Sequence, residues 1–269
     1  MQILKSLFKF YINSSIHVAL SVVSLTIITF IRFDVKIDLH LLTFIFLATI
    51  SGYNFVKYAP VAKLYHRSLT KRLKVIQFFS FLCGILLFVS CFYIKKEVIY
   101  LSIILGLLNM FYAIPAPKSS LREIPLLKIF VIAVIWATTT VCFPFIYVGD
   151  SISFNNLWVF ELIERFFLVV LLMVPFEVRD YPYDRNRIVT IISSLGLDKT
   201  KKIALFVIVV SLLSRILMTG LNNIWVDLLI YSSLILVIVM SNENQRLYFA
   251  SFWVESLPIF WLILSLFFI

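Results

Sequence analysis

Charge is the first thing that this sequence lacks. Asp, Glu, Lys and Arg together make up 14% of its 269 residues, whereas a typical soluble domain carries about a quarter. Hydrophobic residues make up 62% of the chain. A soluble globular protein needs more polar side chains than this to cover its surface, so the composition excludes that class and predicts an integral membrane protein.

Cysteine and histidine are also scarce. The three cysteines, Cys83, Cys91 and Cys142, lie inside apolar stretches, and their spacing matches no metal or redox motif. The sequence therefore indicates no disulfide framework. The three histidines are scattered singly, so no zinc or haem site is predicted.

Linkers are missing as well. The chain has only 6 glycines and 8 prolines, and no hydrophilic segment is long enough to form a second domain. We therefore predict one domain over residues 1–269.

Long apolar runs take the place of the missing charge. A helix needs about 20 apolar residues to cross the hydrocarbon core of a bilayer. The sequence predicts nine such helices, at 13–31, 39–58, 75–94, 98–114, 126–147, 159–178, 200–219, 224–240 and 248–269. The first run follows Lys5 and Lys9 like a signal peptide, but it is long and no small-residue cleavage site follows it, so we expect an uncleaved span. The expected fold class is an all-α integral membrane protein, a single bundle of about nine transmembrane helices.

Basic residues divide unequally between the two sides of this arrangement. Of the 24 basic residues, 18 fall on the side of the N-terminus. The other six are Arg32, Lys36, Lys95, Lys96, Arg165 and Arg215. Because basic residues gather in the cytoplasm, we expect the N-terminus and the loops 57–74 and 179–202 to be cytoplasmic and the C-terminus external, in the inner membrane of a bacterium. The net charge of +10 then reflects topology, and no nucleic-acid partner is predicted.

A group of carboxylates stands at the end of one apolar run, in the sequence F-E-V-R-D-Y-P-Y-D. Glu177, Asp180 and Asp184 are spaced i, i+3 and i+7, which puts them on one face if the helix continues. Carboxylates gathered this closely require a cation, and Mg²⁺ prefers oxygen ligands and commonly binds together with substrate phosphates. The alternative is a set of solvated charges that close a membrane helix through ion pairs with neighbouring arginines. Pro182 could also interrupt the helix and separate the carboxylates.

Two motifs resemble those of a known family. The sequence R-D-x-x-x-D, formed by Arg179, Asp180 and Asp184, is followed by T-I-I-S-S-L-G at 190–196, and a Tyr/Pro/basic stretch covers 112–128. With nine helices and two charged cytoplasmic loops, this pattern resembles the UbiA superfamily of intramembrane prenyltransferases.

The resemblance implies an activity and a set of site residues. Members of the family hold the diphosphate of a prenyl donor through Mg²⁺ and transfer the isoprenoid group to a lipophilic acceptor within the membrane. Carried over to this chain, the catalytic residues are Asp180 and Asp184, and Glu177 joins them as a metal ligand. The residues implied for diphosphate binding are Asn54, Lys63, Arg67, Lys118, Arg122 and Arg179.

The chain departs from the family at the first aspartate motif, which usually reads N-D-x-x-D-x-x-x-D. Here Asn54 is retained, but the aspartate positions hold Phe55, Tyr58 and Ala62. This leaves a second hypothesis open, a non-catalytic relative that binds an isoprenoid lipid or a membrane partner. A transporter ranks third, because it would need polar residues at membrane depth on several helices, and Glu255 is the main one that stands out.

Overall fold

The structure, a computed structural model, describes residues 2–64, 71–113, 127–149, 156–184, 190–220 and 224–268. Every regular element in these ranges is helical. The α-helices are α1 (Gln2–Asn13), α2 (Ile16–Arg32), α3 (Leu39–Leu64), α4 (Lys71–Ser90), α5 (Lys96–Ala113), α6 (Leu127–Ala137), α7 (Phe143–Val148), α8 (Asn156–Asp184), α9 (Ile191–Leu195), α10 (Leu197–Thr219), α11 (Ile224–Met240) and α12 (Leu257–Phe268). The irregular helical segments are η1 (Cys91–Tyr93), which is 3₁₀, and η3 (Thr138–Cys142) and η5 (Phe249–Val254), which are π-helical.

Helices occur at each of the nine predicted positions, but several are longer than the apolar run that predicted them. In particular, α3 continues to Leu64 and α8 continues to Asp184. The prediction stopped where hydrophobicity stopped, whereas a helix satisfies its own backbone hydrogen bonds and can project beyond the apolar region.

Five helical segments are long and apolar enough to cross a membrane, judged over the described residues. They are Leu39–Tyr58, Leu73–Tyr93, Leu127–Val148, Leu197–Thr219 and Phe249–Phe268. The pair α1 and α2, which bends by 56° at Ser14 and Ser15, makes a sixth if it is counted as one span. These helices indicate an integral membrane protein.

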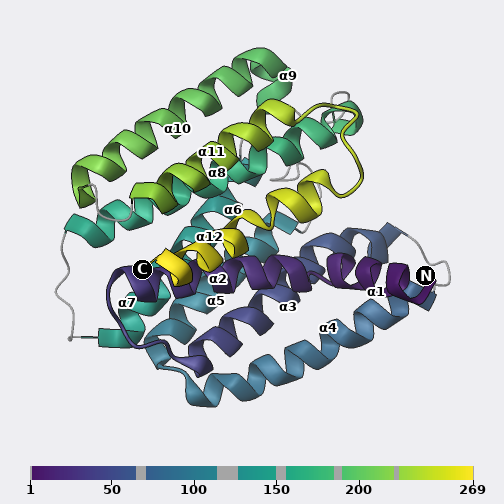
Figure 1. The fold of residues 1–269 in the computed structure, drawn as a ribbon. Coiled ribbons are helices and arrows are strands. Elements are labelled where there is room, and N and C mark those ends of the chain that lie inside the picture. The colour runs from purple at the N-terminus through teal and green to yellow at the C-terminus, as the bar shows by residue number, and fades with distance from the viewer. Residues whose placement is uncertain are drawn as a thin grey trace.

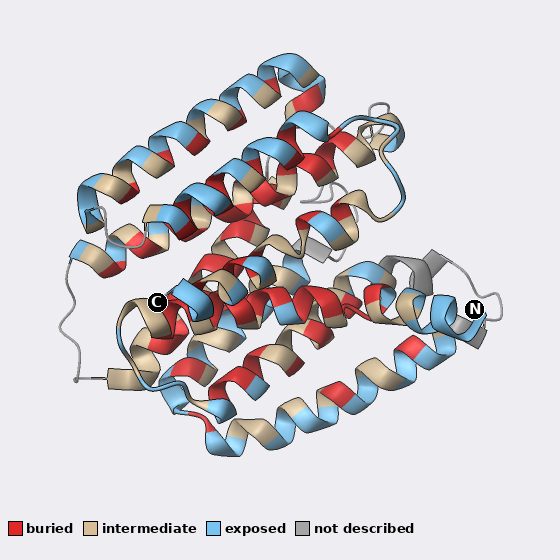
Figure 2. Ribbon diagram, viewed as in Figure 1, coloured by how far each residue is buried: buried red, intermediate tan, exposed pale blue. Residues whose placement is uncertain are grey.

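The bundle is organised around α2 and α8. Helix α2 packs on α3 and α12, and α8 packs on α6, α10 and α11. Helices α4 and α10 lie at opposite edges of the molecule, and α1 begins at the end of the bundle opposite to the end of α12 (Figure 1). The buried faces turn toward α2 and α8, whereas the outer faces of α4 and α10 are largely exposed (Figure 2).

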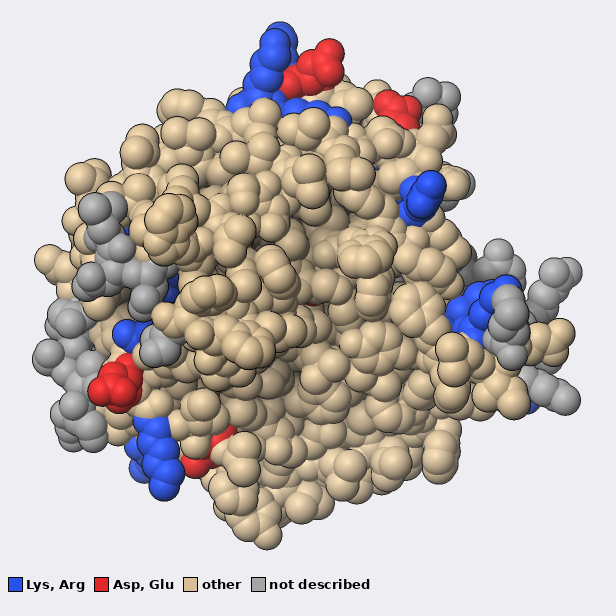
Figure 3. All heavy atoms as spheres, viewed as in Figure 1, with Lys and Arg blue, Asp and Glu red and all other residues tan. Residues whose placement is uncertain are grey.

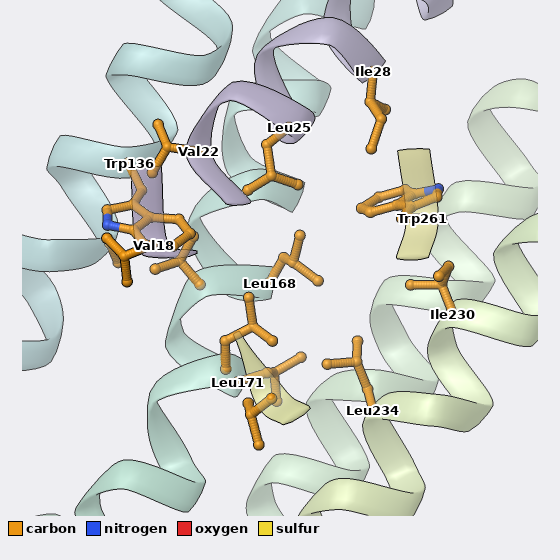
Figure 4. Packing of buried hydrophobic residues seen from close by; sticks show 14 of the residues in the cluster. Val18, Val22, Leu25, Ile28, Trp136, Leu168, Leu171, Ile230, Leu234 and Trp261 are labelled. Atoms are coloured by element: carbon orange, nitrogen blue, oxygen red, sulfur yellow. The ribbon is translucent and has the colours of Figure 1, made fainter. Parts of the chain in front are cut away.

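The core between these helices is aliphatic with two tryptophans. Leu25 and Ile28 of α2 lie opposite Leu168 of α8, with Trp136 and Trp261 filling the spaces on either side (Figure 4). Leu25 is completely buried. In a bilayer the hydrophobic effect does not drive helices together, because lipid tails are as apolar as the side chains. Close packing of this kind therefore supplies much of the stability of a membrane bundle.

The surface shows the same division between apolar and charged regions. On the face shown in Figure 3, the middle of the molecule carries almost no charged side chain, and the Lys, Arg, Asp and Glu side chains lie toward its edges. Exposed apolar side chains include Phe78, Phe81 and Phe88 on α4 and Phe206 on α10. A water-exposed surface of this kind would aggregate, so the outer faces of α4 and α10 are suited to contact lipid.

Candidate functional site

The carboxylate group lies on one continuous helix. Helix α8 extends to Asp184 and contains both Pro175 and Pro182, so Pro182 does not end it. Glu177 is buried, with 6% of its side chain exposed, and Asp180 is partly exposed at 30%. These two carboxylates share a face of α8, because both contact the same residue on a neighbouring helix.

That residue is Lys128, in the first turn of α6. Its Nζ lies 2.7 Å from Oε1 of Glu177 and 3.5 Å from Oδ2 of Asp180. On the other side of Asp180, Nε of Arg179 donates to Oδ1 at 2.8 Å. Two of the three carboxylates predicted to hold Mg²⁺ are therefore paired with cations of the protein itself.

The described residues offer no larger set of metal ligands. Among them, no group of three or more His, Cys, Asp and Glu side chains is arranged to hold a metal ion. Asp184 lies at the end of α8, one turn beyond Asp180. The side chains present fit an ion-pair cluster better than a carboxylate site for Mg²⁺, and the predicted metal role of Glu177, Asp180 and Asp184 stays a prediction.

A further carboxylate, that of Glu255, lies within electrostatic reach of this cluster. Glu255 is in the turn between η5 and α12, where the last span changes from π-helical to α-helical. The charged groups that act on its carboxylate are Lys57 of α3 and Arg179 of α8. Irregular π-helical turns are frequent at functional sites, and a carboxylate at membrane depth requires such cationic neighbours.

The retained residue of the first motif, Asn54, is fully occupied within the fold. Its side-chain amide donates to the carbonyl of Ser14 at 3.0 Å and to the hydroxyl of Ser80 at 2.8 Å, and its oxygen accepts from Ser15 at 2.9 Å. With 3% of its surface exposed, Asn54 joins the corner between α1 and α2 to helices α3 and α4. This is the interhelical role that polar residues often have in membrane bundles.

Two of the three positions where the resemblance would place first-motif aspartates, 55 and 58, lie among the described side chains. The hydroxyl of Tyr58 donates to the carbonyl of Asn13 at 2.8 Å, and Phe55 is exposed. Lys57, between them, directs its Nζ at the carbonyls of Ile12 and Asn13, at 3.4 and 3.5 Å. The described residues 54–58 thus add one cation to the site and no carboxylate.

The other four residues implied for diphosphate binding lie outside the described side chains. Lys63 belongs to the last turn of α3, but its side chain is outside the described set, and Arg67, Lys118 and Arg122 lie outside the described residues.

The motif at 190–196 is described, and its ends have structural roles. Thr190 and Ser193 form a capping box at the start of α9, and Gly196 has φ +82° where the chain turns into α10. A left-handed backbone of this kind favours glycine.

An apolar cavity of about 160 Å³ lies between the helices. Helices α2, α3, α5, α6 and α7 and the segment η3 line it, and its lining includes Tyr53, Asn109, Ile132 and Trp136. Trp136 donates from its indole nitrogen to the hydroxyl of Tyr53 at 2.8 Å. Lys57 follows Tyr53 by four residues on α3, and Lys128 precedes Ile132 by four on α6, so each lysine lies one helical turn from the cavity.

Sequence reasoning missed an ion-pair network at the other end of the bundle. In the sequence, Glu161 and Glu164 stand near the start of an apolar run, where acidic residues complement the N-terminus of a helix, and Arg165 and Arg215 count only as external charges. Both glutamates instead lie buried inside α8. The network joins four helices, α2, α8, α10 and α11, through Arg32, Glu161, Glu164, Arg165, Arg215, Asp227 and Tyr231. The guanidinium of Arg32 also lies 4.6 Å from the ring of Trp261 on α12. The sequence does contain a signal for this network, namely charged residues inside apolar runs, because a charge at such a position is costly unless it is paired.

Comparison with known proteins gives no relative. No family model matches the chain, and no curated protein or solved structure matches it either.

Proposed function

We propose that this chain is a UbiA-like prenyltransferase, which moves an isoprenoid group from a prenyl diphosphate to a lipophilic aromatic or lipid acceptor within the membrane. The observation that supports the proposal best is the position of the charged cluster around Lys128 and Arg179, one turn from an apolar cavity. A prenyl diphosphate has a matching arrangement, because its charged diphosphate end is joined directly to an apolar chain. The R-D-x-x-x-D sequence at Arg179, Asp180 and Asp184 is the family feature that agrees with it.

The proposed topology has nine spans, with this charged end on the cytoplasmic side of a bacterial inner membrane. Five or six spans follow from the length and apolarity of the described helices, and the rest of the proposal comes from the sequence. Helix α8 carries charged residues near both ends, Glu161 and Arg165 at one and Glu177 and Asp180 at the other, with an apolar stretch between them.

The reaction requires the allylic carbon to lose its diphosphate and bond to the acceptor, which releases a proton. Negative charge develops on the leaving diphosphate, so cations fixed beside it lower the barrier. The proposal assigns this role to Arg179, whose guanidinium Asp180 holds through a hydrogen bond of 2.8 Å, and to Lys57. The resemblance implies Mg²⁺ as a further cation, but the paired carboxylates described above do not form a site for it, and we derive no step through the metal.

The proposal predicts that membranes containing the chain consume a radiolabelled prenyl diphosphate and produce a labelled lipid. Asp180→Asn should lower the rate, by up to about 100-fold if Arg179 no longer contacts the leaving diphosphate, since the loss of one transition-state donor costs about this much. The matched control is Asp198→Asn, an exposed aspartate in the first turn of α10. Full activity of both Asp180→Asn and Asp184→Asn would contradict the roles assigned here.

A second candidate function is a non-catalytic protein that binds an isoprenoid lipid. It is favoured by the first motif, which has no carboxylate at Phe55, Tyr58 or Ala62. Binding of a prenyl diphosphate without turnover over a range of chain lengths and acceptors would support this candidate over the enzyme.

A further inference from the structure

Helix α1 differs from the membrane-spanning helices in the distribution of its polar residues. They recur three or four residues apart and are Gln2, Lys5, Ser6, Lys9 and Asn13. Every other residue of the helix is aliphatic or aromatic. This spacing gives α1 one polar and one apolar face, whereas a spanning helix is apolar all round. A two-faced helix with lysines on its polar side is suited to the boundary between lipid and water.

The apolar face of α1 is uncovered over its first two turns (Figure 2). Ile3, Leu4 and Leu7 each expose at least 60% of their surface. Ile3 and Phe10 are seven residues apart and share one side of the helix. The ring of Phe10 lies 5.4 Å from that of Phe79 on α4. The uncovered face therefore begins next to the outer face of α4, which is suited to contact lipid.

The last turn of α1 is held firmly against the bundle. The chain bends by 56° between α1 and α2, and Asn54 bonds to both Ser14 and Ser15 at this corner. The ring of Phe8 packs edge-on against Phe252 of η5, with 5.3 Å between the ring centroids. These contacts turn α1 out of the direction in which α2 runs through the bundle and fix it there.

The charges around α1 are basic and unpaired. Lys5 and Lys9 are exposed, and neither has an ion-pair partner among the described side chains. Lys74, in the first turn of α4, is exposed as well. The sequence contains no Asp or Glu at 1–33 or 39–96, so helices α1 to α4 carry no acidic residue. An anionic membrane surface supplies the complementary charge at the depth where an interfacial helix lies.

We propose that α1 is an interfacial helix that binds anionic phospholipid of the adjoining leaflet. Ile3, Leu4 and Leu7 enter the acyl-chain region, and Lys5 and Lys9 contact the phosphates. A bilayer phospholipid presents an apolar chain and a phosphate together, as the two faces of α1 require, whereas a soluble anion would leave the three apolar side chains in water. This role is independent of the proposed reaction.

The position of α1 is measured in the full chain, with its three cysteines replaced by serine and the protein reconstituted in vesicles. Leu4→Cys and Ser6→Cys each receive a polarity-sensitive fluorophore. Both positions are exposed, but they lie on opposite faces of the helix. We expect bromines on the lipid chains to quench the label at position 4, and the label at position 6 to emit as in water.

The preference for anionic lipid is measured with the same label at position 4. The vesicles contain phosphatidylglycerol and phosphatidylcholine in equal amounts, with bromines on the chains of one lipid or the other. Lys5→Gln with Lys9→Gln should lower the preference for phosphatidylglycerol at least about five-fold, the gain that one lysine brings near an anionic surface. Lys199→Gln with Lys202→Gln removes the same charge from exposed positions on α10 and should leave the preference unchanged.

Several results would overturn the proposal. A water-like label at position 4 in these vesicles would place α1 in solution or on another protein. Equal quenching at positions 4 and 6 would make α1 part of a spanning helix. Equal quenching by the two brominated lipids, or the same loss of preference in the α10 control, would remove the role of Lys5 and Lys9.

Discussion

At the scale of single residues, a buried glutamate far from the predicted site pairs with three arginines. The carboxylate of Glu161 accepts hydrogen bonds from Arg32 at 2.8 Å, Arg165 at 2.6 Å and Arg215 at 3.0 Å. Its side chain is 2% exposed. Removal of the charge would leave three guanidinium groups with too few anionic partners in a region that cannot hydrate them.

Glu161→Gln should therefore destabilise the fold strongly. We expect a loss of about 3–5 kcal/mol in the free energy of unfolding, the usual cost of removing one partner from a buried ion pair. Thermal unfolding in detergent, followed by tryptophan fluorescence, measures the change. Glu97→Gln is the matched control, because Glu97 is exposed in the first turn of α5. Equal melting temperatures for the two variants would show that the network is not a stabilising element.

Sequence reasoning reached some residues of the site and not others, for a physical reason. Helical periodicity predicts that Glu177 and Asp180 share a face, because both belong to one helix. It cannot predict that Lys128 packs across from them, since this depends on how α6 docks on α8. The same limit applies to Arg32 and Arg215, the partners of Glu161 that come from helices distant in sequence, whereas Arg165 is its i, i+4 neighbour on α8.

At the scale of elements, the apolar runs predict where helices occur but not where they break. The corner between α1 and α2 has Ser15 at φ +62°, and the last span begins with a π-helical segment. Neither Ser14 nor Ser15 is a glycine or proline, the residues that usually mark such breaks in a sequence. The corner forms because Asn54, from another helix, holds both serines.

The cavity enclosed by α2, α3, α5 and α6 can be filled by a single substitution. Gly106 lines it, and a Cβ added there would meet nothing within 4 Å. Gly106→Leu should weaken binding of farnesyl diphosphate about ten-fold or more by occupying space that the isoprenoid chain needs, a change of about 1–3 kcal/mol. Stability should not fall, because leucine favours helix more than glycine does.

Gly84 provides the control for this substitution. It also lies within a helix, a Cβ added there also meets nothing within 4 Å, and it does not line the cavity. Gly84→Leu should keep the affinity of the unmodified protein when both variants are titrated with fluorescent farnesyl diphosphate. If the two variants bind equally, the isoprenoid chain lies elsewhere.

At the scale of the whole molecule, the apolar band between two charged edges defines how the protein sits in a bilayer. The distribution of basic residues predicts which edge faces the cytoplasm. The arrangement of the helices by itself is compatible with either orientation in the bilayer. The two ends also differ in kind. One carries the partly exposed cluster of Lys128 and Asp180, and the other carries the buried network around Glu161.

Labelling from outside the cell tests the orientation. In a variant whose three cysteines are replaced by serine, a cysteine at position 96 should react with a membrane-impermeant maleimide in intact cells. A cysteine at position 199 should react only after the cells are opened. Lys96 and Lys199 are both exposed, each in the first turn of its helix, so accessibility alone does not separate them. The reverse pattern would place the candidate site outside the cytoplasm.

The corner between α1 and α2 links the membrane surface to the candidate site. Helix α1 carries Lys5 and Lys9 together with exposed leucines, and such a helix can lie in the plane of the headgroups. The carbonyls at its end accept from Lys57 and Tyr58 of α3. A shift of α1 along the surface, for instance in response to anionic lipid, would move the acceptors that hold Lys57 and so change the position of that charge. Any movement of α1 relative to α3 would therefore also move the Lys57 ammonium.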